Sequence, residues 1–246
     1  MRKIALAYLL AVTVAEVLTT YWEPRAGLVL HGLLVLILVA HTALTWERPA
    51  YQFLLALTFA PLIRLLSLSL PMGRFPLVYW YLITSIPLFA TVWMAMQRLG
   101  LDWGSVGINL RAWAVQLPVG LVGLLFGYME YRILHPRPLA TALTWQQIWL
   151  PALILLVSTG FAEELIFRGL MQRTTQDSLG RWSVPYVSLL FAVLHVGYKS
   201  LLDVIFVFVV AVFFGYIVHK TKSIVGVTLA HGLTNIVLFL VAPFLF

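Results

Sequence analysis

Long apolar runs separated by short polar connections make up most of the chain. Cut at Pro, Gly and clusters of charge, these runs predict nine helical segments, most of them near the roughly 20 residues that span a bilayer. Their approximate bounds are 4–22, 26–45, 50–70, 76–97, 112–134, 147–170, 183–197, 200–219 and 223–243. The first three are the least distinct, so eight segments is the alternative. The pattern predicts an all-α, polytopic membrane helix bundle.

The composition agrees with a lipid environment. The chain of 246 residues is 62% hydrophobic and only 10% charged, whereas a soluble domain has about 25% charged residues. We find no soluble domain and no long linker. The first apolar run is long and lacks a small-residue cleavage site, so we expect a retained first helix, with a cleaved signal peptide as the alternative.

The basic residues fit membrane topology better than nucleic-acid binding, although the net charge is +7. They lie mainly at the ends of apolar runs, where an excess of Lys and Arg marks the cytoplasmic side. Alternating spans place nine on one side and five on the other: Arg2, Lys3, Arg48, Arg98, Arg111, Arg173, Arg181, Lys220 and Lys222 against Arg25, Arg74, Arg132, Arg137 and Lys199. This imbalance predicts a cytoplasmic N-terminus. We expect the protein to lie in the cell membrane.

Ionisable residues inside the predicted spans are the strongest functional signal, because such groups are costly in a bilayer and usually face a cavity or a partner. They are Glu16, Arg64, Glu163, Glu164, Arg168, His195 and His231. Those after residue 160 fall in three short patterns, "EELIFR", "FAVLH" and "HGLTN". Glu16 and Arg64 lie outside these patterns and are expected to pair with each other. His31, His41 and Glu130 lie near predicted span ends and receive no role.

Helical spacing assigns different tasks to the acidic residues. Glu164 and Arg168 are four residues apart, so they share a face and are expected to form an ion pair. Glu163 lies about 100° round the helix, outside that pair. A carboxylate placed there suits a general base.

The other two patterns supply complementary groups. His231 and Asn235 are also four residues apart, and both can donate hydrogen bonds to one point, as an oxyanion hole requires. Phe191 is one turn from His195 and is expected to pack against the site and exclude water. At about 1.5 Å per residue, these groups lie roughly 10 to 18 Å from the cytoplasmic helix ends. We therefore expect an active site in the cytoplasmic half of the bilayer.

The three patterns, EExxxR, FxxxH and HxxxN on successive membrane helices, resemble those of the CPBP family. This family comprises the type II CAAX prenyl endopeptidases and the Abi-type proteins, which are intramembrane glutamic proteases. The resemblance covers roughly residues 110–243. It implies a catalytic helix bundle at 111–246, preceded by transmembrane helices of uncertain role at 1–110.

The family mechanism implies a role for each matching position. Glu163, assisted by His195, activates a water that attacks a peptide carbonyl, and His231 and Asn235 stabilise the oxyanion. Glu164 and Arg168 support the site. The implied substrate is a membrane-associated peptide or lipoprotein, either a lipidated C-terminal CAAX-type peptide or a leader peptide. The oligomeric state stays open.

Other readings of the same residues remain. Two carboxylates and two histidines suit zinc, but no HExxH is present and the resemblance implies catalysis without a metal, so no cofactor is expected. The absence of cysteine excludes disulfides, thiolate metal sites and a cysteine nucleophile. A non-catalytic bacteriocin-immunity or scaffold protein that uses the same cavity for binding is the main alternative function, and a transporter is another.

Overall fold

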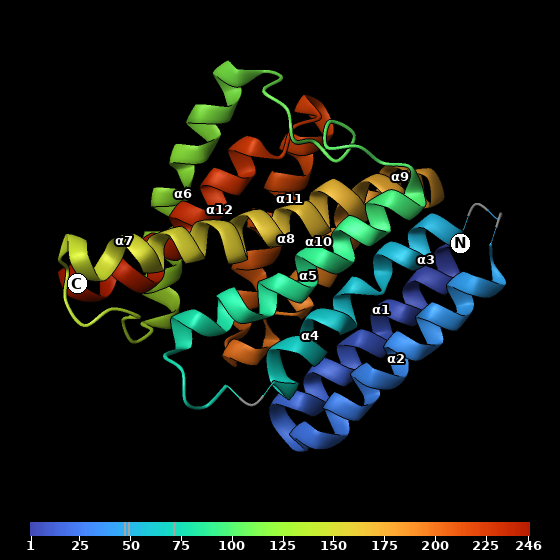
Figure 1. Cartoon of the computed structure of the whole chain (residues 1–246), viewed down its shortest axis with the longest axis horizontal. Coiled ribbons are helices and arrows are strands. Elements are labelled where there is room, and N and C mark those ends of the chain that lie inside the picture. The colour runs from blue at the N-terminus through green and yellow to red at the C-terminus, as the bar shows by residue number, and fades with distance from the viewer. Residues whose placement is uncertain (47, 49, 71) are drawn as a thin grey trace. The chain divides into compact units, whose positions relative to one another are not determined.

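Helices are the regular secondary structure of the described part of the chain. The computed structural model describes residues 1–46, 48, 50–70 and 72–246, and no strand occurs among them. Eight helices in this part are long and apolar enough to cross a membrane (Figure 1). They are Arg2–Trp22, Pro24–Leu44, Tyr51–Ser69, Leu77–Leu99, Trp113–Leu134, Trp145–Tyr198, Leu201–Thr221 and Val225–Leu245. The prediction of an all-α, polytopic helix bundle is confirmed.

The number agrees with the alternative of eight segments, but for a different reason, because the three early segments that were least distinct are all present as separate helices. One helical stretch of 54 residues, Trp145–Tyr198, contains both predicted spans 147–170 and 183–197. The polar residues between them remain helical in α9 (Arg173–Leu179). Only at Gly180, whose φ is +58°, does the backbone leave the right-handed helical region, a conformation that glycine adopts without a side-chain clash. A 3-10 turn, η4 (Gly180–Trp182), then leads into α10 (Ser183–Val193).

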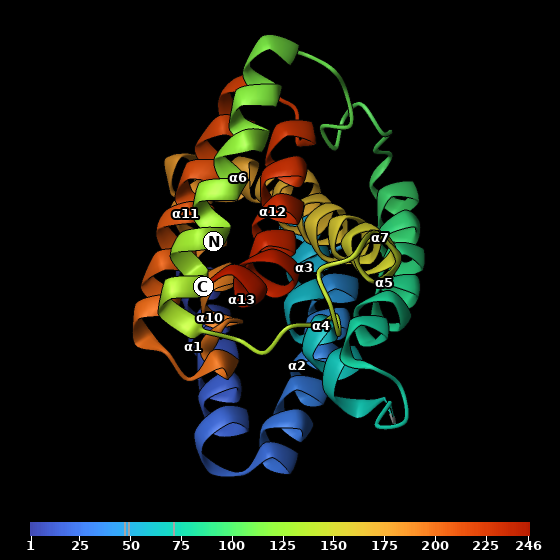
Figure 2. The ribbon, with the colours of Figure 1, turned by 90° about the vertical axis from the view of Figure 1, so that its left-hand side faces the viewer.

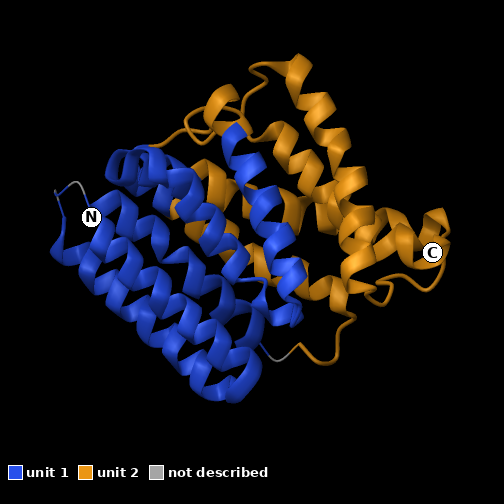
Figure 3. Cartoon of the chain, turned by 180° about the vertical axis from the view of Figure 1, so that it is seen from behind, with its two compact units in different colours: residues 1–70, 95–100, 170–216 blue, residues 71–94, 101–169, 217–246 orange. Residues whose placement is uncertain are grey.

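The helices form two compact units built from discontinuous parts of the chain, and each is described by itself (Figure 3). Unit 1 comprises Met1–Leu70, Ala95–Gly100 and Leu170–Tyr216. Unit 2 comprises Pro71–Met94, Leu101–Gly169 and Ile217–Phe246. The functional division expected near residue 110 stays a prediction.

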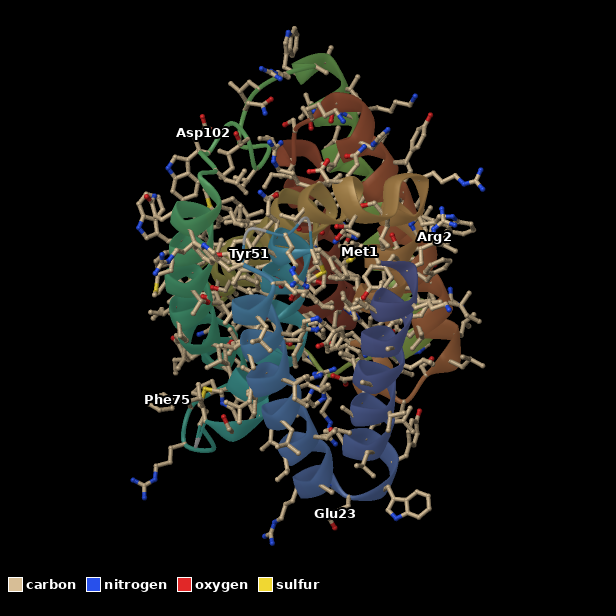
Figure 4. All side chains as sticks on the ribbon, turned by 90° about the vertical axis from the view of Figure 1, so that its right-hand side faces the viewer. Met1, Arg2, Glu23, Tyr51, Phe75 and Asp102 are labelled. Atoms are coloured by element: carbon tan, nitrogen blue, oxygen red, sulfur yellow. The ribbon has the colours of Figure 1, made fainter. Side chains whose placement is uncertain are left out.

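Unit 1 is organised around a helical hairpin. α1 (Arg2–Val17) continues through a π-helical turn, η1 (Leu18–Trp22), and α2 (Pro24–Leu44) packs back against it. Figure 4 shows Glu23 at the tip of this hairpin and Arg2 at the other end of α1. Pro24 occupies the first helical position of α2, where its missing N–H costs nothing.

The remaining helices of unit 1 pack on this hairpin. α3 (Tyr51–Leu57) and α4 (Phe59–Ser69) pack on α2, and α10 packs on α1. Along α1 the exposed side chains include Leu6, Leu10 and Val14, whereas Glu16 is fully buried. This apolar exterior with a charged interior is the arrangement expected of helices in lipid.

Unit 2 is built on close contact between α6 (Trp113–Leu134) and α12 (Val225–Ile236), which lie side by side in Figures 1 and 2. Gly120, Gly123 and Gly127 form a stripe along α6 that faces α12. A Cβ added at Gly123 would collide with the backbone of Ala230. Small residues at such an interface let two membrane helices approach closely.

Other helices complete the two units. In unit 2, α7 (Trp145–Ile154) leads into the stretch packed on α12, and η6 (Val237–Val241) and α13 (Ala242–Leu245) follow α12. A buried hydrophobic core of unit 2, around the segments that follow α12, contains Tyr131, Ala140, Leu155, Leu238, Phe239, Leu240 and Ala242. α5 (Leu77–Leu99) and α11 (Leu201–Thr221) each contribute residues to both units.

Replacing Gly123 with Ala is expected to lower the free energy of unfolding by about 1–3 kcal/mol, the usual cost of overpacking, because the new methyl group forces α6 away from α12. Thermal unfolding in detergent micelles measures the effect. Gly32→Ala is the matched control, since a Cβ there meets only the end of the Leu65 side chain at 3.9 Å. That variant should be as stable as the wild type or more stable, and equal stability of the two variants would contradict this role for Gly123.

Candidate active site

The acidic pair lies on a helical stretch of unusual geometry. Glu163 and Glu164 belong to a short α-helical segment, α8 (Ala162–Glu164), between two π-helical segments, η2 (Leu155–Phe161) and η3 (Leu165–Gln172). π-helical segments are rare and occur frequently at functional sites. The motif predicted from spacing therefore lies where the helix departs from regular α geometry.

A contact between two glycines brings this stretch against α12. A Cβ added at Gly160 would lie 2.8 Å from the backbone nitrogen of Gly232 and 3.0 Å from its Cα. A Cβ added at Gly232 would in turn collide with Cδ1 of Leu156 and lie 3.1 Å from its Cα, so the missing side chain of each glycine lets the two helices approach. Gly232 is the neighbour of His231, so the contact places that histidine beside the acidic pair.

Glu164 is completely buried and has two partners. Arg168 Nη1 donates to its Oε1 over 2.8 Å, which confirms the predicted ion pair. His231 Nδ1 lies 2.9 Å from the same oxygen. Because the ion-paired carboxylate only accepts hydrogen bonds, the proton of this bond belongs to Nδ1 of the imidazole. Glu164 thus joins two helices.

Glu163 lies on the other side of the same histidine. Its Oε2 is 3.9 Å from Nε2 of His231, and 30% of its side-chain surface is exposed. The imidazole therefore lies between two carboxylates, one sealed from solvent and one accessible. A general base must reach both water and substrate, and the exposed part of Glu163 meets this requirement.

Asn235 is held by a residue that the sequence analysis did not single out. Its Nδ2 donates to Oγ1 of Thr159 over 2.8 Å, and the hydroxyl of Thr159 donates to the carbonyl of Leu155. His231 and Asn235 thus both face the stretch 155–164, which confirms that they share a face of α12. Thr159 precedes Glu163 by four residues. That spacing places the two residues near the same face of a helix, so the sequence could have indicated Thr159 as a site residue.

Phe191 and His195 belong to unit 1, whereas the other five site residues belong to unit 2. His195 follows the end of α10, and its Nδ1 lies 2.9 Å from the carbonyl oxygen of Phe191. Since a carbonyl only accepts, the proton resides on Nδ1 and Nε2 is the basic nitrogen. The two rings pack with centroids 4.8 Å apart, so Phe191 packs against His195 as expected. The assistance of His195 to Glu163 stays a prediction.

The described residues contain no group of three or more His, Asp or Glu side chains that could hold a metal ion. The expectation that the protein works without a cofactor stays an expectation.

Comparison with known proteins assigns this part of the chain to a class. Residues 145–237 match the family model described as Rce1-like, type II CAAX prenyl endopeptidase Rce1-like. The match confirms the CPBP resemblance across the stretch that holds all seven site residues. It supports a protease, a hydrolase of the CAAX-processing type, in an integral membrane protein. No curated protein and no solved structure gives a significant match.

Removing one member of the buried ion pair should destabilise the protein strongly. Glu164→Gln leaves Arg168 buried without its anion, and breaking such a pair costs about 3–5 kcal/mol. Thermal unfolding in detergent checks this, with Glu163→Gln as the matched control because Glu163 is partly exposed. The double variant Glu164→Gln/Arg168→Met should recover part of the loss. Equal stability of Glu164→Gln and Glu163→Gln would show that the pair is not what holds this region.

Proposed function

We propose that the protein is an intramembrane endopeptidase that hydrolyses a peptide bond with a water activated by Glu163. One observation carries the proposal most directly: His231 is held between the buried Glu164–Arg168 pair and the accessible Glu163. The carboxylate of Glu163 and the imidazole of His231 are then adjacent, 3.9 Å apart, so that both could contact the same water and substrate. General-base hydrolysis needs such an arrangement.

In the proposed reaction, Glu163 takes a proton from water and the resulting hydroxide attacks the peptide carbonyl carbon. The tetrahedral intermediate carries its negative charge on the former carbonyl oxygen. As this intermediate collapses, the C–N bond breaks and the leaving nitrogen receives the proton held by Glu163. The family resemblance assigns His195 to assist Glu163, and its Nδ1–H tautomer leaves Nε2 as the nitrogen suited to that task.

His231 and Asn235 are proposed to stabilise the oxyanion. Nδ1 of His231 is committed to Glu164, so the ring can donate to an oxyanion only through Nε2, and only as the imidazolium. Asn235 has two amide N–H donors, and Thr159 accepts from one of them. The second is then the donor to the oxyanion. Glu164 and Arg168 support this arrangement by fixing the histidine.

The proposed substrate is a membrane-associated peptide, in the first place one with a lipidated C-terminal CAAX-type sequence. A leader peptide is the second substrate class. We propose that the N-terminus is cytoplasmic, that the protein lies in the cell membrane, and that the site lies in the cytoplasmic half of the bilayer. The distribution of Lys and Arg among the loops supports this orientation.

Replacing Glu163 with Gln should lower kcat by at least about 100-fold, the lower range for loss of a general base, while the protein stays folded. The assay uses purified protein in lipid vesicles, with a farnesylated CAAX peptide and the same peptide without the farnesyl group. Cleavage is followed by mass spectrometry. Full activity of Glu163→Gln would exclude the proposed mechanism. Failure of the wild type to cleave either peptide, or a leader peptide, would favour the non-catalytic binding function.

A chelator arm of the same assay tests the cofactor. A reaction in which Glu163 activates water without a metal should proceed unchanged in the presence of EDTA. Loss of activity that added zinc restores would instead indicate a functional metal.

Replacing Asn235 with Ala should lower kcat by about 100- to 1,000-fold, as loss of an oxyanion donor does, with little change in KM. Thr234→Val is the matched control. Thr234 neighbours Asn235 on α12, but its hydroxyl donates to backbone carbonyls of Gly123 and Ala230, so kcat should stay near that of the wild type. A comparable loss in both variants would point to a packing effect.

A further inference from the structure

A second buried charged cluster lies in unit 1, outside the three motifs. Arg64 Nε donates to Glu16 Oε1 over 2.6 Å, and His31 Nε2 lies 3.3 Å from the same oxygen. These residues come from α4, α1 and α2. The predicted pairing of Glu16 with Arg64 is confirmed, and His31, which had received no role, is its fully buried neighbour.

Arg64 has a second bond, and it leads to the end of α10. Its Nη2 donates to the backbone carbonyl of Leu194, the residue before His195. The last carbonyls of a helix have no partner within the helix, and a positive charge is favourable at this end. Arg64 therefore caps α10 at the point where the chain leaves the helix.

The same helix end holds the ring of His195. Nδ1 of His195 bonds to the carbonyl of Phe191, and its backbone nitrogen donates to Ala192 over 2.9 Å. The following turn, η5 (Val196–Tyr198), packs on α1 and η1. Within it, a Cβ added at Gly197 would lie 3.6 Å from Nη2 of Arg64. The backbone on both sides of His195 is therefore next to this guanidinium.

We propose that Glu16, His31 and Arg64 form a positioning network that sets the orientation and tautomer of His195. The inference rests on the proposed function, in which His195 assists Glu163. Arg64 acts through the carbonyl of Leu194 and touches no reacting group, so it is a positioning residue. Glu16 orients the guanidinium, and Nε2 of His31 lies against the same carboxylate oxygen that accepts from Arg64.

The charge of Arg64 is what distinguishes it from a packing residue. A charged side chain inside a membrane helix is expensive, and an apolar residue of similar size would fill the same volume. The fork of a guanidinium, however, bonds two acceptors at fixed angles. Here it bonds Glu16 with Nε and Leu194 with Nη2, and a lysine could not hold both in the same geometry.

The test compares Arg64→Met, Arg64→Lys and the double variant Glu16→Gln/Arg64→Met with the wild type. The double variant is needed because Arg64→Met alone leaves Glu16 buried without its cation. Tyr8→Phe is the matched control, because it removes a different polar contact of α1, the 2.8 Å bond between Tyr8 and His41 that joins α1 to α2.

Two measurements are made on each variant in detergent micelles. One is kcat and KM on the farnesylated CAAX peptide. The other is the pair of ring ¹⁵N chemical shifts of His195, assigned by their loss in His195→Gln, which report the tautomer without requiring activity.

Arg64→Met and the double variant should lower kcat by about 10- to 100-fold, with KM within about 2-fold, as a misplaced catalytic group does. The ¹⁵N shifts of His195 should move toward a mixture of tautomers. Arg64→Lys should recover part of both effects, and Tyr8→Phe should match the wild type in both.

An unchanged kcat or unchanged His195 shifts in the folded double variant overturns the inference, because Arg64 would then act only in packing. The two proposals fail separately. If Glu163→Gln still cleaves the peptide, the proposed function fails whatever Arg64 does. If Glu163→Gln is inactive while the Arg64 variants keep the kcat and ring shifts of the wild type, only this inference fails.

Discussion

The carboxylate of Glu164 is the constraint around which unit 2 is arranged. It is fully buried, and an ion removed from water costs several kcal/mol unless its partners compensate. One partner, Arg168, comes from the same helix, and the other, His231, comes from α12. The bond to His231 exists only if the two helices meet closely at this level. The contact between Gly160 and Gly232 is what permits that approach, so packing and electrostatics depend on the same pair of residues.

This arrangement separates two adjacent and chemically identical side chains. Glu164 is enclosed and uses its charge to hold Arg168 and His231, whereas 30% of the Glu163 side chain is exposed. The helix is π-helical on both sides of the pair, where backbone bonding departs from the regular α pattern. Fixed neighbours around one accessible carboxylate are what a preorganised hydrolytic site needs, and the Rce1-like match falls on this stretch.

Unit 1 contains a cluster of the same chemical make-up. Glu16, Arg64 and His31 repeat the set of one carboxylate, one guanidinium and one imidazole found at Glu164, Arg168 and His231. The difference is in origin, since the unit 1 cluster draws one residue from each of three helices. Its guanidinium reaches the end of α10 beside His195. In unit 1 the Glu16–Arg64 pair thus lies next to His195, and in unit 2 the Glu164–Arg168 pair lies next to His231.

The sequence by itself determined what depends on local periodicity and composition. Apolar runs predicted the membrane helices, and four-residue spacing predicted the Glu164–Arg168 pair, because neighbours on one helix face meet wherever that helix lies. The continuation of the helix beyond residue 170 through the polar residues of α9, as far as the break at Gly180, was missed, since hydropathy does not distinguish a polar helical turn from a loop. Only the tertiary structure decided that His231 binds Glu164, that Thr159 holds Asn235 and that His31 adjoins Glu16. Those contacts join separate helices, and which helices meet depends on how small residues let their backbones pack.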